Sequence, residues 1–444
     1  MSSSSVVSAL AQELLDAVLD FLWDDRRSLL ASSLVARNWV AATRHHLFER
    51  IVLSLVVHAR GVRDTALPFI ELCRSPLCTV LPGIRDVLIV VEDAEGEVVK
   101  DLVDLLGSSP VRRLSFIDRA KTRQSLAWIV PSFPQLRHFT YNGAEDAFTT
   151  DMPALVAAFP HLRSLSLFSA DKELNLFIPD APAPAFIHLT TLRLRFLTDV
   201  ADAVLGWLLP VGERMRLETL DLVLFFEYHS GWGPVDNLNA LLRTQAASLK
   251  TFSVQVTYGE KNSDIDDWER VANTSLGDID LSPLTALETL YLAQHHVAAL
   301  LSTLSSLSSS ATRIRSVEIA FKEWLYWYDI PCSCNAAVQV VEFADIMAHQ
   351  RFRDRLARFV IRVPAFFGSQ GIEELWKYFP TWRDHPGTEI LLREEDEVYP
   401  EGAVERYDVR RAVFGLLAPE DESDEEAIVG GMEGFNWDDS DDSD

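Results

Sequence analysis

One pattern of apolar and polar positions, apolar-x-x-apolar-x-apolar, recurs ten times between residues 84 and 361. In each copy the last two apolar positions alternate with polar ones, which is the pattern of a short strand with one buried face. Six of the nine intervals between successive starts lie between 25 and 28 residues, so the pattern marks a structural repeat. The ten copies begin at Ile84, Val111, Leu136, Leu162, Leu189, Leu217, Leu249, Leu287, Ile314 and Leu356.

The chain between these strands is long enough for helices. Two examples are "TDVADAVLGWLL" from Thr198 and "DNLNALLRTQAAS" from Asp236, in which Leu238, Leu241 and Leu242 share one helical face. Each unit has an apolar edge that only its neighbours can cover, so stacked units predict an α/β fold, a curved solenoid with strands on its concave side. The spacing resembles the leucine-rich-repeat family in its strand-plus-helix form. The usual Asn or Cys after the strand is mostly missing, although Asn142 follows one copy.

Residues that flank the inward apolar positions are expected to line the concave face. Each alone is an ordinary solvated strand residue, but as a row they form the extended surface that the repeat singles out, and we expect it to bind a substrate protein. The predicted substrate-binding residues are Arg113, His138, Arg193, Arg195, Asp221, Gln255, Tyr291 and Glu318.

Before the repeats, apolar residues between Leu10 and Leu53 recur at helical intervals. They predict one amphipathic helix that ends at "WDD", a second around Leu29 to Val35, and a third from Trp39 to Leu47. Three short helices in about 45 residues make a minimal core. Their apolar faces therefore need a partner inside or outside the chain.

This segment resembles the F-box family, in particular F-box-like segments joined to leucine-rich repeats in fungal proteins. The resemblance rests on "LAQELL", on "SLVARNW" from Ser33 and on the Arg44-x-x-Leu47-Phe48 ending; Ala11 and Ala36 replace the usual Pro and Cys. The resemblance implies that the helices bind a Skp1-like adaptor and, through it, a cullin-RING ubiquitin ligase. The adaptor-binding residues it implies are Leu10, Leu14, Leu15, Val18, Leu22, Leu29, Leu34, Val35, Trp39, Leu47 and Phe48.

Two other interpretations of the chain use the same solenoid. The helices could instead cap the first repeats, in which case the protein would be an interaction scaffold without adaptor binding. Enzyme signatures such as G-x-x-x-x-G-K, G-x-S-x-G and H-E-x-x-H are missing from the sequence, so we expect neither catalytic residues nor cofactors. Four cysteines lack the paired spacings of zinc sites, so core or surface thiols are expected rather than a metal.

These patterns divide the chain into five predicted parts. Residues 1–8 are a disordered start, 9–53 the F-box-like helices, 54–370 the solenoid, 371–417 a capping region and 418–444 an acidic disordered tail. Within 371–417, "GIEELWKYFPTW" and "ERYDVRRAVFGLLA" are predicted to be closing helices. The insertion "FKEWLYWYDIPCSC" from Phe321 provides aromatic residues either for the core or for a recognition patch.

Charge narrows the choice of partners. The net charge is −26, and the segment 419–444 contributes twelve Asp or Glu and no Lys or Arg, which leaves −26 + 12 = −14 for the rest. We therefore expect no nucleic-acid partner, because phosphate binding depends on Lys and Arg. The tail is either solvated or a docking segment for a basic surface. The start has no basic leader and the chain no long apolar run, so we expect an intracellular protein, cytoplasmic and/or nuclear, with no membrane partner.

Overall fold

The computed structural model describes part of the chain, and the account below is confined to that part. The described residues are 12–22, 25–35, 37–55, 65–76, 78–91, 96–118, 133–143, 159–169, 188–226, 236–258, 279–294, 297–307, 313–321, 345–347, 355–364, 372–373, 376–377 and 379–393.

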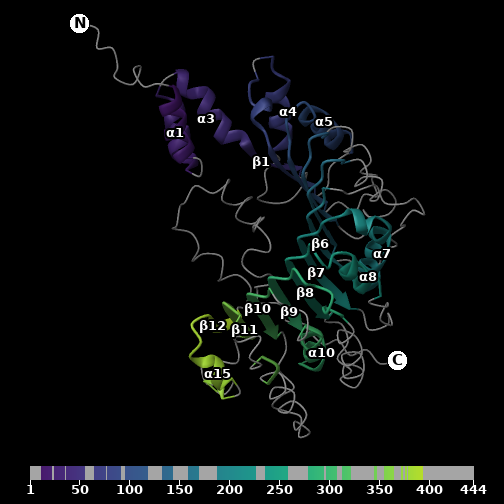
Figure 1. Cartoon of the computed structure of the whole chain (residues 1–444). Coiled ribbons are helices and arrows are strands. Elements are labelled where there is room, and N and C mark those ends of the chain that lie inside the picture. Colours follow the sequence, from purple (N-terminus) through teal and green to yellow (C-terminus); the bar gives the residue numbers. More distant parts are fainter. Residues whose placement is uncertain are drawn as a thin grey trace, which may run out of the picture. The chain divides into compact units, whose positions relative to one another are not determined.

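The protein has an α/β fold built on one twelve-stranded sheet. All strand pairs are parallel, and the strands follow one another in chain order from β1 to β12 (Figure 1). The strands are β1 Arg50–Leu55, β2 Asp86–Val91, β3 Arg113–Asp118, β4 His138–Gly143, β5 Ser164–Ser169, β6 Thr191–Leu197, β7 Thr219–Phe226, β8 Thr251–Tyr258, β9 Thr289–Gln294, β10 Ser316–Phe321, β11 Arg358–Pro364 and β12 Thr388–Arg393.

The ten predicted strands are all confirmed, and each begins two residues after the first apolar position of its pattern. Parallel neighbours need a crossover between them, and helices supply several of these connections. The helices are α1 Gln12–Phe21, α2 Arg26–Ser33, α3 Arg37–Glu49, α4 Ala66–Arg74, α5 Gly96–Leu106, α7 Thr198–Leu208, α8 Asp236–Thr244, α10 Val297–Leu307 and α15 Pro380–Arg383, with 3-10 turns η2 Leu81–Gly83 and η4 Leu209–Arg214. The two helices predicted after Thr198 and Asp236 are among them.

The core lies on one face of the sheet and runs through successive units. The three apolar positions of each pattern are buried there, for example Leu217, Leu220 and Leu222 around β7. Leu238, Leu241 and Leu242 of α8 are buried in the same continuous cluster, as their spacing predicted. Figure 1 shows α5, α7, α8 and α10 on one side of the strands. In the described units the apolar edge is covered by the next unit, and α5, α7, α8 and α10 cover it further where they occur.

Backbone hydrogen bonds extend the sheet one residue beyond the start of the strands. The residue after the first apolar position donates its N–H to the carbonyl of the equivalent residue in the preceding unit. Arg112 donates to Arg85 over 2.8 Å, Arg137 to Arg112 over 2.8 Å and Arg163 to Arg137 over 2.7 Å. The ladder continues through Thr190, Glu218, Lys250, Glu288, Arg315 and Ala357. Its backbone is fixed by the fold, whereas its side chains are not part of the core.

Two strands were not predicted. β1 begins at Arg50, inside the segment 9–53 that we assigned to helices; its pattern starts at Phe48, which also belongs to the F-box resemblance. β12 lies in the predicted capping region, and its pattern is degraded because His385 and Thr388 stand at two of the three apolar positions. A Cβ on Gly387 would lie 1.8 Å from the carbonyl oxygen of Ala357, so this close approach requires glycine.

The structure describes only part of the predicted capping region, acidic tail and aromatic insertion. Around the predicted closing helix, Phe379 and Trp382 of the α15 region pack on Phe359 with ring centroids 6.2 and 5.0 Å apart, but β12 then continues the sheet. The predicted helix "ERYDVRRAVFGLLA", the acidic tail and nearly all of the aromatic insertion lie outside the described residues.

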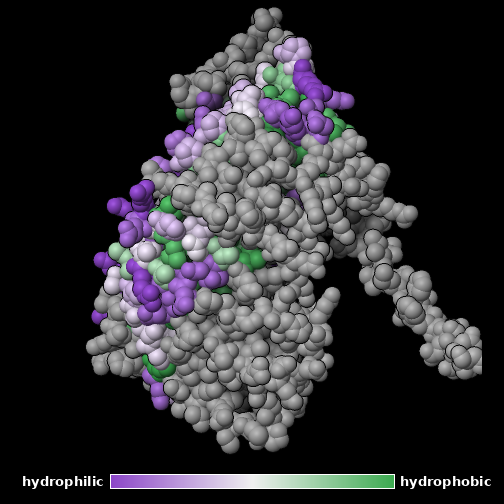
Figure 2. Space-filling view, turned by 90° about the vertical axis from the view of Figure 1, so that its right-hand side faces the viewer, coloured by the Kyte–Doolittle hydropathy of each residue, from purple (hydrophilic) through white to green (hydrophobic). Residues whose placement is uncertain are grey.

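Two properties of the described surface bear on partners. Figure 2 presents the side that lies at the right of Figure 1; among the described residues visible there, hydrophilic ones predominate and hydrophobic ones show in smaller areas. Within the described helices, none combines the length and the apolar character needed to cross a lipid bilayer.

The repeat predicts the stability effect of neighbouring substitutions. Leu217 is fully buried, so Leu217→Ala should lower the free energy of unfolding by about 2–5 kcal/mol through lost burial and a residual cavity. The matched control is Glu218→Ala, which removes only a half-exposed ion pair with Lys250 at 3.1 Å and should cost less than about 1 kcal/mol. Urea unfolding followed by circular dichroism measures both. Equal losses would contradict the assignment of the pattern's first position to the core.

Candidate protein interaction surfaces

All eight residues predicted to bind a substrate lie on the sheet face opposite the core. Strand register places Arg193, Asp221, Tyr291 and Glu318 in one row across β6 to β10, with Ser253 between them. Arg195 and Gln255 belong to the next row, and Arg113 and His138 pair with each other where their strands begin. The alternation of side chains along a strand is what makes this placement predictable.

Four of these side chains are buried, so the expectation that each is a solvated strand residue is wrong for them. They are Asp221, Gln255, Tyr291 and Glu318. The other four are half-buried. Adjacent parallel strands lie about 4.8 Å apart, so each side chain is flanked by its row neighbours as well as by the rows on either side. Charged groups in such a row need partners, because burying an unpaired charge is costly.

Asp221 occupies the middle of the face between two polar neighbours. Its carboxylate accepts a hydrogen bond from Ser253 and is attracted by Arg193. Both interactions favour the ionised form, but burial outweighs them and raises the pKa of this carboxyl above its ordinary value. Burial likewise lowers the pKa of the Arg195 guanidinium. This part of the face therefore holds charges at a cost in stability.

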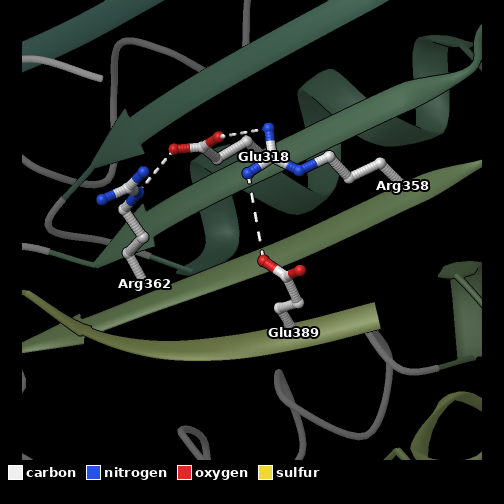
Figure 3. A network of polar contacts seen from close by, with 4 residues as sticks. All are labelled: Glu318, Arg358, Arg362 and Glu389. Carbon is white, nitrogen blue, oxygen red and sulfur yellow. Dashed lines mark hydrogen bonds and ion pairs between the residues drawn. The ribbon is translucent and has the colours of Figure 1, made fainter. Parts of the chain in front are cut away.

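Glu318 forms the centre of a charged network on the last strands (Figure 3). Its Oε1 lies 2.6 Å from Nε of Arg362, and its Oε2 lies 3.9 Å from a guanidinium nitrogen of Arg358. Arg358 in turn reaches Glu389 of β12 at 3.9 Å. The network links β10, β11 and β12, so Glu318 stabilises the sheet rather than standing free for a partner.

A smaller network lies at the other end of the face. Asp86 of β2 lies 3.4 Å from Arg50 of β1 and 3.6 Å from Arg113 of β3. Arg113, predicted to bind a substrate, is therefore paired within the sheet and is only partly exposed.

The N-terminal helices form a small core of their own. Leu19, Leu29 and Leu47 are buried in it, with Leu22, Trp39 and Phe48 packed around them. Leu29 and Leu47, which we predicted to bind the adaptor, are thus buried inside the segment. Asp25 caps α2 by accepting hydrogen bonds from the N–H and hydroxyl of Ser28, which lower the pKa of its carboxyl. His46 lies 2.9 Å from Asp20, which ties α3 to α1.

Helix α1, helix α2 and the two residues that follow α2 carry exposed apolar side chains. Six of the eight large exposed hydrophobic residues in the described part of the chain are found here, with Phe21 at 84% and Leu34 at 87% exposure. Four of the six were predicted, whereas Phe21 and Leu30 were not, because neither belongs to the F-box pattern. The helical spacing of Phe21 from Leu14 and Val18 was the signal that could have found it. The six are Leu14, Val18, Phe21, Leu30, Leu34 and Val35.

Two further residues, Leu10 and Leu15, were predicted to bind the adaptor. Leu10 and the side chain of Leu15 lie outside the part of the chain that the structure describes.

Helix α3 joins the N-terminal segment to the sheet. It runs directly into β1, packs against η2, and its Arg44 donates a hydrogen bond to the Thr79 hydroxyl over 2.8 Å. α1 and α2 pack on α3. The alternative that the helices cap the repeats thus describes α3 but leaves the exposed apolar side of α1 and α2 without a role.

Two of the four cysteines, Cys73 and Cys78, lie in the described part of the chain. Burial raises the pKa of the Cys73 thiol to about 12, so it is a neutral core side chain at neutral pH, and Cys78 lies nearby with partial exposure. Cys332 and Cys334 lie outside the described residues.

No protein-family model matches this chain, and no curated protein sequence is similar to it. A function must therefore be inferred from the residues and their geometry.

The two arginines that face Glu318 should differ sharply in importance. Arg362→Met removes the 2.6 Å partner and leaves a carboxylate that is only about 10% exposed, which should cost about 3–5 kcal/mol of unfolding free energy. Arg358→Met is the matched control: that side chain is 51% exposed and 3.9 Å away, so its loss should cost less than about 1 kcal/mol. Urea unfolding of both variants tests this difference, and similar costs would show that the geometry of the network is wrong.

Asp221→Asn should change how stability depends on pH. A carboxyl whose pKa is raised by folding contributes stability below its unfolded pKa of about 3.9, and this contribution is lost as the pH rises through the folded value. The amide does not titrate but can still accept from Ser253. The variant should therefore gain stability relative to wild type between pH 4 and pH 8, measured by urea unfolding at each pH. A difference that stays constant with pH would contradict the raised pKa.

Proposed function

We propose that this protein is a non-catalytic substrate receptor of a Skp1-cullin-F-box type ubiquitin ligase. In this proposal α1 to α3 are F-box-like helices that bind a Skp1-like adaptor, and the strand-plus-helix units form a curved leucine-rich-repeat solenoid that binds a substrate protein. The observation that carries the proposal is that six of the eight large exposed hydrophobic residues in the described part of the chain lie between Leu14 and Val35, on α1, on α2 and directly after α2.

Such a concentration is unusual on a surface that faces only water. Scattered exposed hydrophobic residues need no explanation, but clustered ones mark an interface. Here they lie on two short helices whose own core contains only a few side chains. Fully burying one such residue contributes about 1.5–3 kcal/mol, so a partner that covered several would also stabilise the segment.

The geometry suits a groove that accepts helices. Leu14, Val18 and Phe21 follow one another at helical spacing along α1, which is the arrangement of anchors in helix-in-groove recognition. Phe21 and Leu34 are the most exposed members, so they are the proposed central contacts. Aromatic anchors of this kind commonly dominate interface energies.

The sheet face is the proposed substrate surface. Its half-buried members Arg113, His138, Arg193 and Arg195 retain exposed area for contacts, whereas Asp221, Gln255, Tyr291 and Glu318 would support them from below. The chain would supply no reacting group. It would hold a substrate lysine near the ubiquitin-conjugating enzyme, and the gain in rate would come from proximity. This function implies a cytoplasmic or nuclear location.

One observation favours a second function. α3 packs on η2 and β1 as an end cap would, so the same helices also fit an interaction scaffold that never binds an adaptor. The two functions differ only in what covers the outer side of α1 and α2.

Co-expression of the full chain with a Skp1-type adaptor separates the two functions. The double variant Phe21→Asp and Leu34→Asp should weaken adaptor binding at least tenfold, because both side chains are exposed and central to the proposed interface. The control is Leu67→Asp with Leu72→Asp, which places the same two charges at exposed apolar positions on α4, outside the proposed interface, and should leave affinity unchanged. Calorimetry or surface plasmon resonance measures the affinities.

A folded wild-type chain that bound no adaptor would overturn the receptor proposal and leave the scaffold function. Equal losses in the two double variants would instead show that binding does not use α1 and α2.

A further inference from the structure

Four consecutive units of this acidic protein place an arginine at the same position. Arg85, Arg112, Arg137 and Arg163 each follow the first apolar residue of a unit, and their backbones form the hydrogen-bonded ladder described above. A chain with a net charge of −26 has 66 acidic and only 40 Lys or Arg residues, so a run of four cations at one repeat position is against its overall composition.

The ladder fixes how far apart these charges lie. Strands in a sheet are about 4.8 Å apart, so Arg112, Arg137 and Arg163 span about 10 Å from first to last. Their three side chains are exposed, whereas Arg85 is half-buried. Together with Gln135, His161 and His188 they line a surface hollow of about 320 Å³. The rings of the two histidines lie 6.2 Å apart.

These three guanidinium groups are not neutralised within the described part of the chain. None has an ion pair with a described carboxylate. The next part of the same ladder differs, because Glu218, Lys250, Glu288 and Arg315 alternate in sign, and Lys250 lies 3.1 Å from Glu218. Like charges about 5 Å apart repel one another, and a bound anion would relieve that repulsion. Among the described residues, Lys250 and Glu218 compensate each other in the later part of the ladder, whereas Arg112, Arg137 and Arg163 have no such ion pair.

We infer that this arginine row, Arg112, Arg137 and Arg163, binds a short acidic segment of a partner protein. Guanidinium groups hold carboxylate or phosphoryl oxygens through paired hydrogen bonds, and Gln135 adds a neutral amide donor. An extended peptide rises about 3.3–3.6 Å per residue, so three or four residues cover the row. Asp, Glu or phosphoserine side chains supply the same anionic chemistry.

A peptide fits this surface better than a nucleic acid does. The row is short, and a long polyanion would continue from it over a protein that carries strong negative charge, where it would be repelled. A peptide can confine its charges to the row. The inference goes beyond the proposed function and does not depend on it, because the row is built on the residues directly before β3, β4 and β5 and uses no residue of α1 or α2.

Fluorescence anisotropy with the full-length chain tests the inference. The probes are four labelled ligands of equal length: a Glu-rich peptide, a phosphoserine peptide, a Gln-substituted neutral peptide and a single-stranded oligonucleotide. The variant Arg112→Gln, Arg137→Gln and Arg163→Gln removes the row. The matched control Arg214→Gln, Arg243→Gln and Arg313→Gln removes three other exposed arginines and the same total charge.

We expect the wild type to bind the Glu-rich or the phosphoserine peptide, more weakly as salt is raised, and to ignore the neutral one. The row variant should lose at least tenfold in affinity and the control less than twofold. The tighter of the two anionic peptides identifies the source of the charge. The twelve carboxylates of 419–444 are present in every variant and so do not distinguish them.

Three results would overturn the inference: no binding of either anionic peptide by the folded wild type, equal losses in the two triple variants, or tighter binding of the oligonucleotide than of both peptides. Adaptor binding measured on the same row variant should be unchanged, so a failure here is distinguishable from a failure of the receptor proposal. Unfolding midpoints confirm that both triple variants are folded.

Discussion

The structure depends on the fact that no unit of this chain can supply the backbone hydrogen-bonding partners of its own strand. A parallel strand has its hydrogen-bonding partners in other units, and the apolar edge of each unit is covered only by the next one. The register from β1 to β12 and the continuous core from Leu53 to Trp382 follow from this single constraint. It also explains why the ladder bonds outside the strands are so regular: they belong to the same stacking contact.

The same stacking also brings charged side chains close together on the sheet face opposite the core. Side chains on that face are brought within strand spacing of their row neighbours, and charges there lose part of their hydration. The way in which these charges are compensated differs along the sheet. Glu318 and Asp86 are each matched by arginines, whereas Asp221 remains a buried carboxyl with a raised pKa. The sequence predicts a row of exposed polar residues on this face, but many of them are buried and bonded to one another within the sheet.

The repeat made most of the fold predictable from sequence. Its period gave the strands, and the alternation within each strand gave the face on which Arg193 or Gln255 lies. What the sequence could not provide is cross-strand information: that Arg362 would reach Glu318 depends on the register of two units 44 residues apart. β12 escaped detection because His385 and Thr388 replace apolar residues, and β1 because Phe48 fitted two patterns at once. The helical periods of α2 and α3 likewise could not tell which apolar residues would be buried between the helices, so Leu29 and Leu47, which we expected to contact an adaptor, lie in the core of the segment.

The positions of the repeat therefore differ in what their residues can reveal. Residues at the core positions allow the fold to be predicted, since any apolar residue of suitable size can fill them. A charged residue on the face opposite the core can have either of two causes, because pairing across strands and binding of a partner both favour charge. The ladder position contributes its backbone to the fold, and its side chain is not constrained by core packing, although Lys250 and Glu218 form an ion pair there. The three exposed arginines in succession at that position form no ion pair with a described carboxylate and do not pack in the core. Their side chains are therefore the ones in the repeat whose identity is best explained by binding to a partner.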